Sequence, residues 1–204
     1  MKILVVGASG LIGSTFLRVL TENKNWKVFG TVRSALSKQS ILSALHSNVI
    51  SDLDVLNSDQ LLETFHEVRP NVVVNCAGLT KHDARSSNPI SSLPINAVFP
   101  HKLSKLCNLM SARLIHLSSD CVFAGKKGGY TEEELTDAAD LYGISKALGE
   151  VINHRAITIR TSTIGHEKFS KNGLLEWFLS QDESCNGYSQ AFFSGLPTVI
   201  LARL

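Results

Sequence analysis

Tyr142 and Lys146 lie four positions apart in the segment LYGISKALGE (141–150). On a helix this spacing puts both side chains on one face, one turn apart. A tyrosine hydroxyl with its ordinary pKa of about 10 is a poor acid–base group at neutral pH. A neighbouring ammonium, or another cation close by, would lower that pKa. Ser118 and Ser119 end the apolar run RLIHLSS and can supply a hydroxyl that polarises a substrate carbonyl.

The segment GASGLIG (7–13) follows the apolar run KILVVG and precedes an amphipathic stretch. Gly7 allows a tight turn, Gly10 lets the backbone approach a pyrophosphate, and Gly13 lets helix and strand pack closely. The helix that follows offers free N–H groups to an anion. We therefore predict a dinucleotide site, although three glycines can also form an ordinary turn. The residues of this segment expected to bind the cofactor are Gly7, Ser9, Gly10, Leu11, Ile12 and Gly13.

The end of the predicted second strand (26–32) lacks the acid that usually holds the ribose hydroxyl of NAD. No Asp or Glu occurs between Glu22 and Asp52, and Arg33 lies where a 2′-phosphate would sit. This pattern favours NADPH over NADH, unless Arg33 only belongs to a solvated basic face. Asp52 and Leu53 follow the third strand, where they could meet the adenine, although Asp52 could equally be a turn or cap residue.

Short apolar runs alternate with amphipathic segments along most of the chain. Strand–helix alternation of this kind predicts an α/β fold, with a doubly wound parallel sheet and helices on both faces. The predicted strands are 2–7, 26–32, 47–51, 71–78, 113–119 and 156–162, and the predicted helices are 11–20, 34–46, 60–68, 95–110 and 140–153.

Composition limits the function classes that remain. Of 204 residues, 44% are hydrophobic and 19% are charged, with a net charge of +2, which excludes disorder and argues against a nucleic-acid binder. The four cysteines form no C-x-x-C pair and are read as reduced thiols of a cytoplasmic protein. No apolar run is long enough to cross a membrane, and no His or Cys pattern indicates a metal site. His116 lies inside a predicted strand, which is typical of a core histidine.

Five motifs occur in order at the expected strand ends: GASGLIG, NCAG (75–78), SSDCVF (118–123), LYGISKALGE and IRTS (159–162). With these motifs the chain resembles the extended short-chain dehydrogenase/reductases, and among them the dTDP-4-dehydrorhamnose reductase group of sugar-nucleotide reductases. The resemblance implies a Rossmann domain. It also implies hydride transfer from NADPH to the keto carbon of a nucleotide-linked 4-keto-6-deoxy sugar, in deoxysugar or polysaccharide biosynthesis.

The resemblance also implies roles for individual residues. Tyr142 would donate the proton, Lys146 would hold the nicotinamide ribose and lower the pKa of Tyr142, and Ser119 would hydrogen-bond the carbonyl, with Ser118 as the alternative. Asn96 matches a family asparagine that helps to organise the site, although it could also be a helix cap. The other residues implied for the cofactor are Cys76, Ala77 and Gly78, and those implied for the substrate are Ser119, Val122, Phe123 and Thr163.

Three other activities are compatible with part of this pattern, and each meets a contrary observation. A dehydratase would carry a second acid where Cys121 stands. An epimerase shares Tyr-x-x-x-Lys but holds NAD tightly, and the missing acid after the second strand speaks against it. A non-catalytic, cofactor-binding regulatory subunit is the remaining rival, and the intact Ser119, Tyr142 and Lys146 argue against it.

The pattern weakens after residue 165. A long loop (124–139), a helix at 173–181 and a helix opening at Pro197 are expected, with a cofactor domain at 1–163 and an incomplete substrate-binding region at 164–204. The chain stops inside the apolar run VILARL, which we read as a chain cut short. That exposed apolar end predicts self-association, for example as a homodimer. Trp177 and Phe178 are expected in the core, with stacking on a base or sugar as the alternative.

Overall fold

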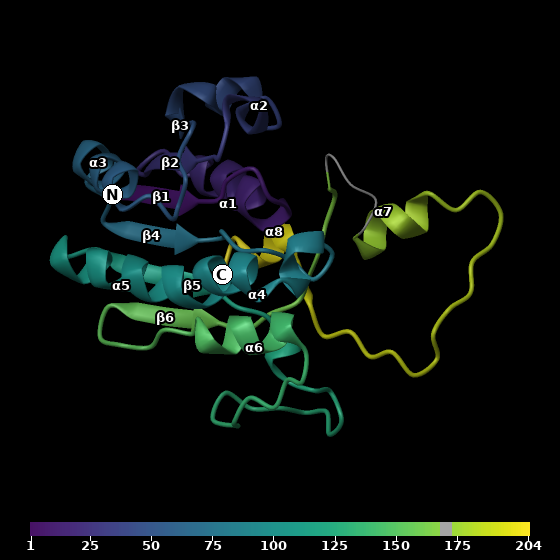
Figure 1. The fold of residues 1–204 in the computed structure, drawn as a ribbon. Helices are drawn as coiled ribbons and strands as arrows, with labels where there is room; N and C mark the ends of the chain where they lie inside the picture. Colours follow the sequence, from purple (N-terminus) through teal and green to yellow (C-terminus); the bar gives the residue numbers. More distant parts are fainter. Residues whose placement is uncertain (168–172) are drawn as a thin grey trace.

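The sheet that positions the site is parallel and has six strands in the order β3-β2-β1-β4-β5-β6 (Figure 1). It is seen in a computed structural model that describes residues 1–167 and 173–204. The order reverses between β1 and β4, and in doubly wound folds a ligand binds at this switch point, beyond the carboxyl ends of the strands. The predicted fold class is confirmed. The strands are β1 (Lys2–Val6), β2 (Lys27–Thr31), β3 (Val49–Ile50), β4 (Val72–Asn75), β5 (Arg113–Leu117) and β6 (Ala156–Ile159).

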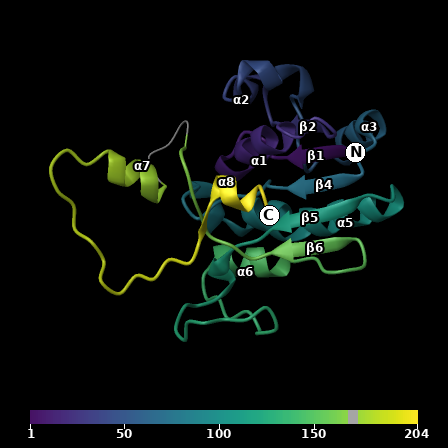
Figure 2. The same cartoon turned by 180° about the vertical axis from the view of Figure 1, so that it is seen from behind.

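Helices cover both faces of this sheet (Figures 1 and 2). The α-helices are α1 (Leu11–Thr21), α2 (Ala35–Lys38), α3 (Ser58–Val68), α4 (Pro89–Ser92), α5 (Phe99–Leu109), α6 (Leu141–Leu148), α7 (Leu174–Leu179) and α8 (Thr198–Leu201). Three 3-10 helices are η1 (Ser43–Asn48), η2 (Ala84–Ser87) and η4 (Asp120–Val122), and η3 (Leu93–Val98) is a π-helix.

Strand β1 shows how the sequence builds two cores. Successive side chains of a strand point to opposite faces. Leu4 and Val6 therefore enter one apolar cluster with residues of α3 and α5, whereas Ile3 and Val5 enter a second cluster with residues of α1 and α8. Because both faces are covered, β1 is apolar at almost every position, as expected for a central parallel strand.

The prediction of one continuous helix at 34–46 was wrong. The chain forms the short α2, a turn and the 3-10 helix η1 instead. Serine side chains compete with helical hydrogen bonds here. The Ser34 hydroxyl accepts the N–H of Ser37, and the Ser40 hydroxyl donates to the carbonyl of Ser37 at 2.6 Å. The turn also buries Ile41, which a continuous helix would place differently.

The predicted helix 140–153 is shorter than expected, because α6 ends at Leu148 and Gly149 caps it. The backbone N–H of Val151 then bonds to the Thr158 hydroxyl at 2.8 Å, which turns the chain into β6. The predicted helix 95–110 begins with the π-helix η3 and continues as α5.

The C-terminal segments divide into two parts. Strand β7 (Thr163–Ile164) pairs with β8 (Leu196–Pro197), and α8 then packs beside α1, with Leu201 and Ala202 buried. In contrast, α7 and the chain that follows it extend away from the sheet (Figure 1). Trp177 and Phe178 are exposed on α7, so the expectation that they belong to the core was wrong.

Within the two described ranges, no helix combines the length and the apolar character that a membrane crossing needs.

Candidate functional site

Two glycines shape a cradle at the carboxyl end of β1. Gly7 has a φ of 81°, a backbone conformation that residues other than glycine rarely adopt. A Cβ at Gly7 would also lie 2.8 Å from the backbone nitrogen of Ala77, and one at Gly13 would collide with the Gly7 carbonyl. The first turn of α1 is therefore drawn tightly against the ends of β1 and β4.

The N-terminus of α1 is suited to an anion. Gly10 occupies the N-cap position without a side-chain cap, and the first turn contains no acid. The first N–H groups of a helix have no acceptor inside it, so those of α1 are open to phosphate oxygens. A Cβ at Gly10 would lie 3.7 Å from its nearest atom, an ordinary contact, so the packing of the protein does not by itself require glycine at this position. The cradle thus fits a dinucleotide pyrophosphate by its shape and its donors.

Ser119 and Tyr142 come together from different elements. Ser119 precedes η4, where its hydroxyl accepts the N–H of Cys121 at 3.1 Å and donates to Asp120 at 3.2 Å. Helix α6 approaches this turn closely, because a Cβ on Gly143 would collide with the Cys121 carbonyl. Burial raises the pKa of Tyr142, and a side-chain hydrogen bond with Ser119 partly offsets this rise. The direction is opposite to the expected lowering, and Lys146 is not among the causes.

Lys146 lies one helical turn beyond Tyr142 on α6, as the spacing predicted. Its side chain is 6% exposed, and its Nζ donates to the carbonyl of Leu117 at 2.7 Å. A Cβ on Gly78 would lie 3.8 Å from that Nζ, so the loop after β4 passes directly over the ammonium group. Burial lowers the pKa of Lys146 to about 8, against smaller opposing effects of Cys76 and Glu150.

Asn96 joins the loop after β4 to α6. Its Oδ1 accepts the N–H of Leu79 at 2.8 Å, and its Nδ2 donates to the carbonyl of Leu79 and to the Ser145 hydroxyl. It lies inside η3 and is 1% exposed, so the helix-cap alternative was wrong. The arrangement ties Gly78 and Leu79 to the helix that carries Tyr142 and Lys146.

Asp140 is a site residue that the sequence analysis missed. Its Oδ1 accepts the N–H of Gly143 at 2.7 Å and so caps α6, while its Oδ2 pairs with Lys81 at 3.0 Å. Hydrogen bonding to Gly143, followed by Lys81, lowers its pKa. An Asp directly before an amphipathic segment is a helix-start signal that could have indicated it.

Arg33 follows β2, and Asp52 and Leu53 follow β3. Arg33 is exposed, and it is close enough to Asp83 to contribute to the lowered pKa of that carboxyl. Asp52 has a φ of 64° and accepts the N–H of Ala35 at 3.2 Å, so it is a turn residue. The Leu53 side chain is buried in the core. Contact of these residues with an adenosine stays a prediction.

The residues expected to meet the substrate differ in their accessibility. Val122 is fully buried, and its carbonyl accepts N–H groups from the 124–139 loop. Phe123 stacks on Tyr130, with ring centroids 4.3 Å apart, and the Arg160 guanidinium lies 5.0 Å from its ring. Thr163 belongs to β7. Their contacts with a substrate stay predictions, although Val122 exposes no surface in this structure.

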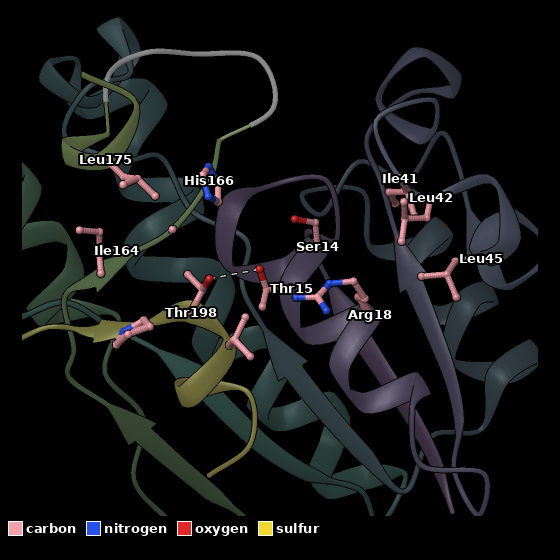
Figure 3. A pocket seen from close by; sticks show the side chains of 13 residues that line it. Ser14, Thr15, Arg18, Ile41, Leu42, Leu45, Ile164, His166, Leu175 and Thr198 are labelled. Carbon is pink, nitrogen blue, oxygen red and sulfur yellow. Dashed lines mark hydrogen bonds between the residues drawn. The ribbon is translucent and has the colours of Figure 1, made fainter. Parts of the chain in front are cut away.

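A cavity lies on another part of the molecule. It has a volume of about 550 Å³ and is bounded by α1, residues 41–45 and the segments around β7 and β8 (Figure 3). Thr15 and Thr198 hydrogen-bond across one wall at 3.3 Å. No residue expected to bind cofactor or substrate lines this cavity, so we do not assign the chemistry to it. Within the described ranges, no group of three His, Cys, Asp or Glu residues could hold a metal ion.

Comparison with known proteins agrees with this geometry. Residues 1–185 match the family described as the RmlD substrate binding domain. The chain belongs to this family. The resemblance to sugar-nucleotide reductases inferred from the motifs is therefore confirmed at the level of the family.

Three examples illustrate the proteins that are similar to this chain in sequence or in structure. The chain is 28% identical to the dTDP-4-dehydrorhamnose reductase of Aggregatibacter actinomycetemcomitans, over 79% of this chain and 51% of the relative. It is 30% identical to methionine adenosyltransferase 2 subunit beta of Rattus norvegicus, over 73% of this chain and 41% of the relative. A dTDP-4-dehydrorhamnose reductase structure from Clostridium acetobutylicum aligns with a TM-score of 0.76 at 28% identity, covering 100% of this chain and 68% of that one.

The chain thus spans 41–51% of the length of the two curated relatives. Both a reductase and a subunit of another enzyme are found among the proteins similar to this chain. Function therefore has to be argued from the residues of this chain.

Proposed function

We propose that the protein reduces the 4-keto group of a nucleotide-linked 4-keto-6-deoxy sugar with NADPH. The observation that carries the proposal is the meeting of Ser119, Tyr142 and Lys146 at the carboxyl end of β5, with the loop after β4 between them and the glycine cradle of β1. Supporting it, the chain matches the RmlD substrate binding domain family and is similar to the dTDP-4-dehydrorhamnose reductase of Aggregatibacter actinomycetemcomitans.

The dinucleotide would be held by the cradle at Gly7 to Gly13, by the loop from Cys76 to Gly78 and by Lys146. When bound, it supplies the hydride that reduces the keto carbon. Arg33, exposed just beyond β2, supports a preference for the 2′-phosphate of NADPH. The absence of an acid between Glu22 and Asp52 supports the same choice and disfavours the epimerase alternative.

The chain's own residues handle the proton. The Tyr142 hydroxyl would donate its proton to the oxygen that becomes the product's alcohol. Burial raises its pKa, which leaves the hydroxyl protonated but makes it a weaker acid, so the Lys146 ammonium and the bound dinucleotide would have to oppose that rise. Ser119 hydrogen-bonds the same oxygen once its hydroxyl turns away from Asp120. Lys146 keeps its charge below pH 8 and can donate to a ribose hydroxyl of the dinucleotide.

The test is loss of NADPH absorbance with a panel of dTDP- and UDP-linked 4-keto-6-deoxy sugars. Replacing Tyr142 by Phe is expected to reduce turnover by about a hundredfold or more, the usual share of a general acid. NADPH binding should persist in this variant. Tyr188→Phe, at an exposed position, is the matched control and should retain full activity. Equal turnover in the Tyr142→Phe variant would contradict the proposal.

A second candidate is a non-catalytic, cofactor-binding subunit of another enzyme. The likeness to methionine adenosyltransferase 2 subunit beta favours it. A protein of this kind would bind NADPH, but none of the sugars in the panel would cause NADPH to be oxidised. Its effect on the partner enzyme would persist in the Tyr142→Phe variant. The Tyr142→Phe comparison therefore separates the two candidates.

We also propose a cytoplasmic location, which the free thiols of Cys76, Cys107, Cys121 and Cys185 support. Self-association, for example as a homodimer, stays a proposal, and light scattering would test it. Its original basis is weakened, since Leu201 and Ala202 of the apolar end are buried against the sheet.

A further inference from the structure

A buried polar pair lies directly behind the cofactor loop. Asn75 ends β4 and His116 is its register partner on β5. Both side chains are completely buried, and the Asn75 Nδ2 lies 3.0 Å from the His116 Nδ1. None of the catalytic roles above uses either residue. Burying a polar pair in a central sheet costs folding free energy unless its donors and acceptors are hydrogen-bonded. The pair is therefore expected to have a role beyond filling the core.

The orientation of both side chains follows from their neighbours. The Oδ1 of Asn75 accepts the backbone N–H of Ala77 at 3.1 Å. The other end of the amide, Nδ2, is therefore the donor toward His116, whose Nδ1 must accept and cannot carry a proton. Burial, followed by the charges of Lys146 and His101, lowers the pKa of His116 to about 3. The histidine is consequently neutral at physiological pH, with its proton on Nε2, a buried nitrogen that has no hydrogen-bond partner among the described residues.

The pair reaches the dinucleotide cradle through Ala77. The backbone nitrogen and Cα of Ala77 lie 2.8 and 2.9 Å from the point that a Cβ on Gly7 would occupy. The loop from Cys76 to Gly78 thus presses on the glycine-rich turn on one side and passes over Lys146 on the other. A shift of the Ala77 N–H would displace this loop and so change its contacts with the Gly7 turn and with Lys146.

We propose that His116 is a positioning residue for dinucleotide binding: by accepting from Asn75 it orients the amide that holds the Ala77 N–H against Gly7. The inference deepens the proposed function and rests on it. His116 touches neither cofactor nor substrate and acts through Asn75. A histidine that merely filled the core could be replaced by an apolar side chain of similar shape, whereas a positioning histidine needs an acceptor at the place of Nδ1.

Two substitutions of similar shape separate these roles. His116→Asn puts an oxygen at the place of Nδ1 and keeps the acceptor, whereas His116→Leu puts a methyl group there. Phe65→Leu, in the apolar cluster on the same face of the sheet, is the control for general loosening of the fold. The measurements are NADPH affinity by fluorescence and hydrogen exchange of the Ala77 amide in the cofactor-free protein.

We expect His116→Leu to weaken NADPH binding about tenfold, the size of one lost buried hydrogen bond, and to speed exchange of the Ala77 amide. His116→Asn should bind and exchange nearly as the unaltered protein does, and Phe65→Leu should bind NADPH normally. Unchanged affinity and exchange in His116→Leu would overturn the inference. It would also be overturned if His116→Asn or Phe65→Leu behaved like His116→Leu.

The two proposals fail in different ways. If the unaltered protein binds neither NADPH nor NADH, the proposed function is overturned. The expected effect of His116 on NADPH affinity is then overturned as well. Exchange of the Ala77 amide still decides, in that case, whether His116 orients the loop. If the unaltered protein binds NADPH and the His116 variants do not differ, only the positioning role is lost.

Discussion

Burial has opposite effects on the pKa values of the two functional groups on α6. It raises the pKa of Tyr142 and lowers that of Lys146 to about 8, because it disfavours the charged form of each group. The tyrosine consequently stays protonated and is a weaker acid than a free tyrosine, whereas the lysine is the group whose charge changes in a mildly alkaline solution. We therefore expect activity to fall at alkaline pH in a single step, as Lys146 loses its proton.

We expect kcat/KM to be constant up to about pH 7.5 and to fall about tenfold per pH unit well above 8. The charged ammonium is the form that can donate to the ribose, and it is lost as pH rises through the pKa of about 8. Rate measurements from pH 6 to 9.5 check this, with NADPH affinity followed in parallel. A profile that stays flat to pH 9.5 would contradict the role assigned to Lys146.

Arg33 tests the choice of cofactor. Replacing it by Ala should weaken NADPH binding about tenfold, the loss of one charge-assisted hydrogen bond to the 2′-phosphate, and leave NADH affinity unchanged. Lys24→Ala, an exposed residue before the start of β2, removes the same charge as a control. Equal losses for NADPH and NADH in the Arg33 variant would argue against 2′-phosphate recognition.

At the scale of elements, the site depends on where helices begin. Helix α1 starts at an uncapped glycine and leaves its N–H groups open. Helix α6 starts at Asp140, whose carboxylate satisfies the N–H of Gly143. One helix start is thus left available to a ligand, while the other is anchored by its own cap, which holds Tyr142 and Lys146 in place.

Alanine at Gly10 and at Gly13 should have different consequences. Gly10→Ala finds ordinary space in the protein and should change the free energy of unfolding by only about 0.5 kcal/mol. It would still obstruct the pyrophosphate and weaken NADPH binding strongly. Gly13→Ala collides with the Gly7 carbonyl and should lower both stability and binding. Denaturant unfolding and NADPH titration check both variants, and full affinity in Gly10→Ala would count against the cradle.

At the scale of the whole molecule, the last residues return to the sheet. Leu201 and Ala202 are buried in the cluster that also contains Phe16 and Leu17 of α1, whereas α7 buries no residue. The expected division at residues 163 and 164 stays a prediction. The packing of α8 nevertheless makes part of the second region contribute to the core of the first.

Leu201→Ala should therefore lower the free energy of unfolding by about 3 kcal/mol, as for other buried leucines. Leu179→Ala, at a 58% exposed position on α7, should change it by no more than about 0.5 kcal/mol. Urea unfolding of both variants checks this difference. If the two substitutions cost the same, α8 is not part of the cooperative core.

Much of this architecture could be predicted from local patterns. Apolar runs with helical or continuous spacing indicated the six strands and the long helices α1, α3 and α5, because periodicity depends only on neighbours in the chain. The spacing of Gly7, Gly10 and Gly13 and of Tyr142 and Lys146 is local in the same sense. These patterns were sufficient to predict the fold class and the residues most central to the proposed chemistry.

Tertiary structure decided which distant residues meet. The approach of Gly7 to Ala77, the pairing of Asn75 with His116 and the burial of Lys146 under Gly78 join segments far apart in the sequence. Strand order, register and close packing determine such contacts, and no single segment encodes them. For the same reason the direction of the Tyr142 pKa was predicted wrongly, since it follows from how deeply the fold buries the hydroxyl.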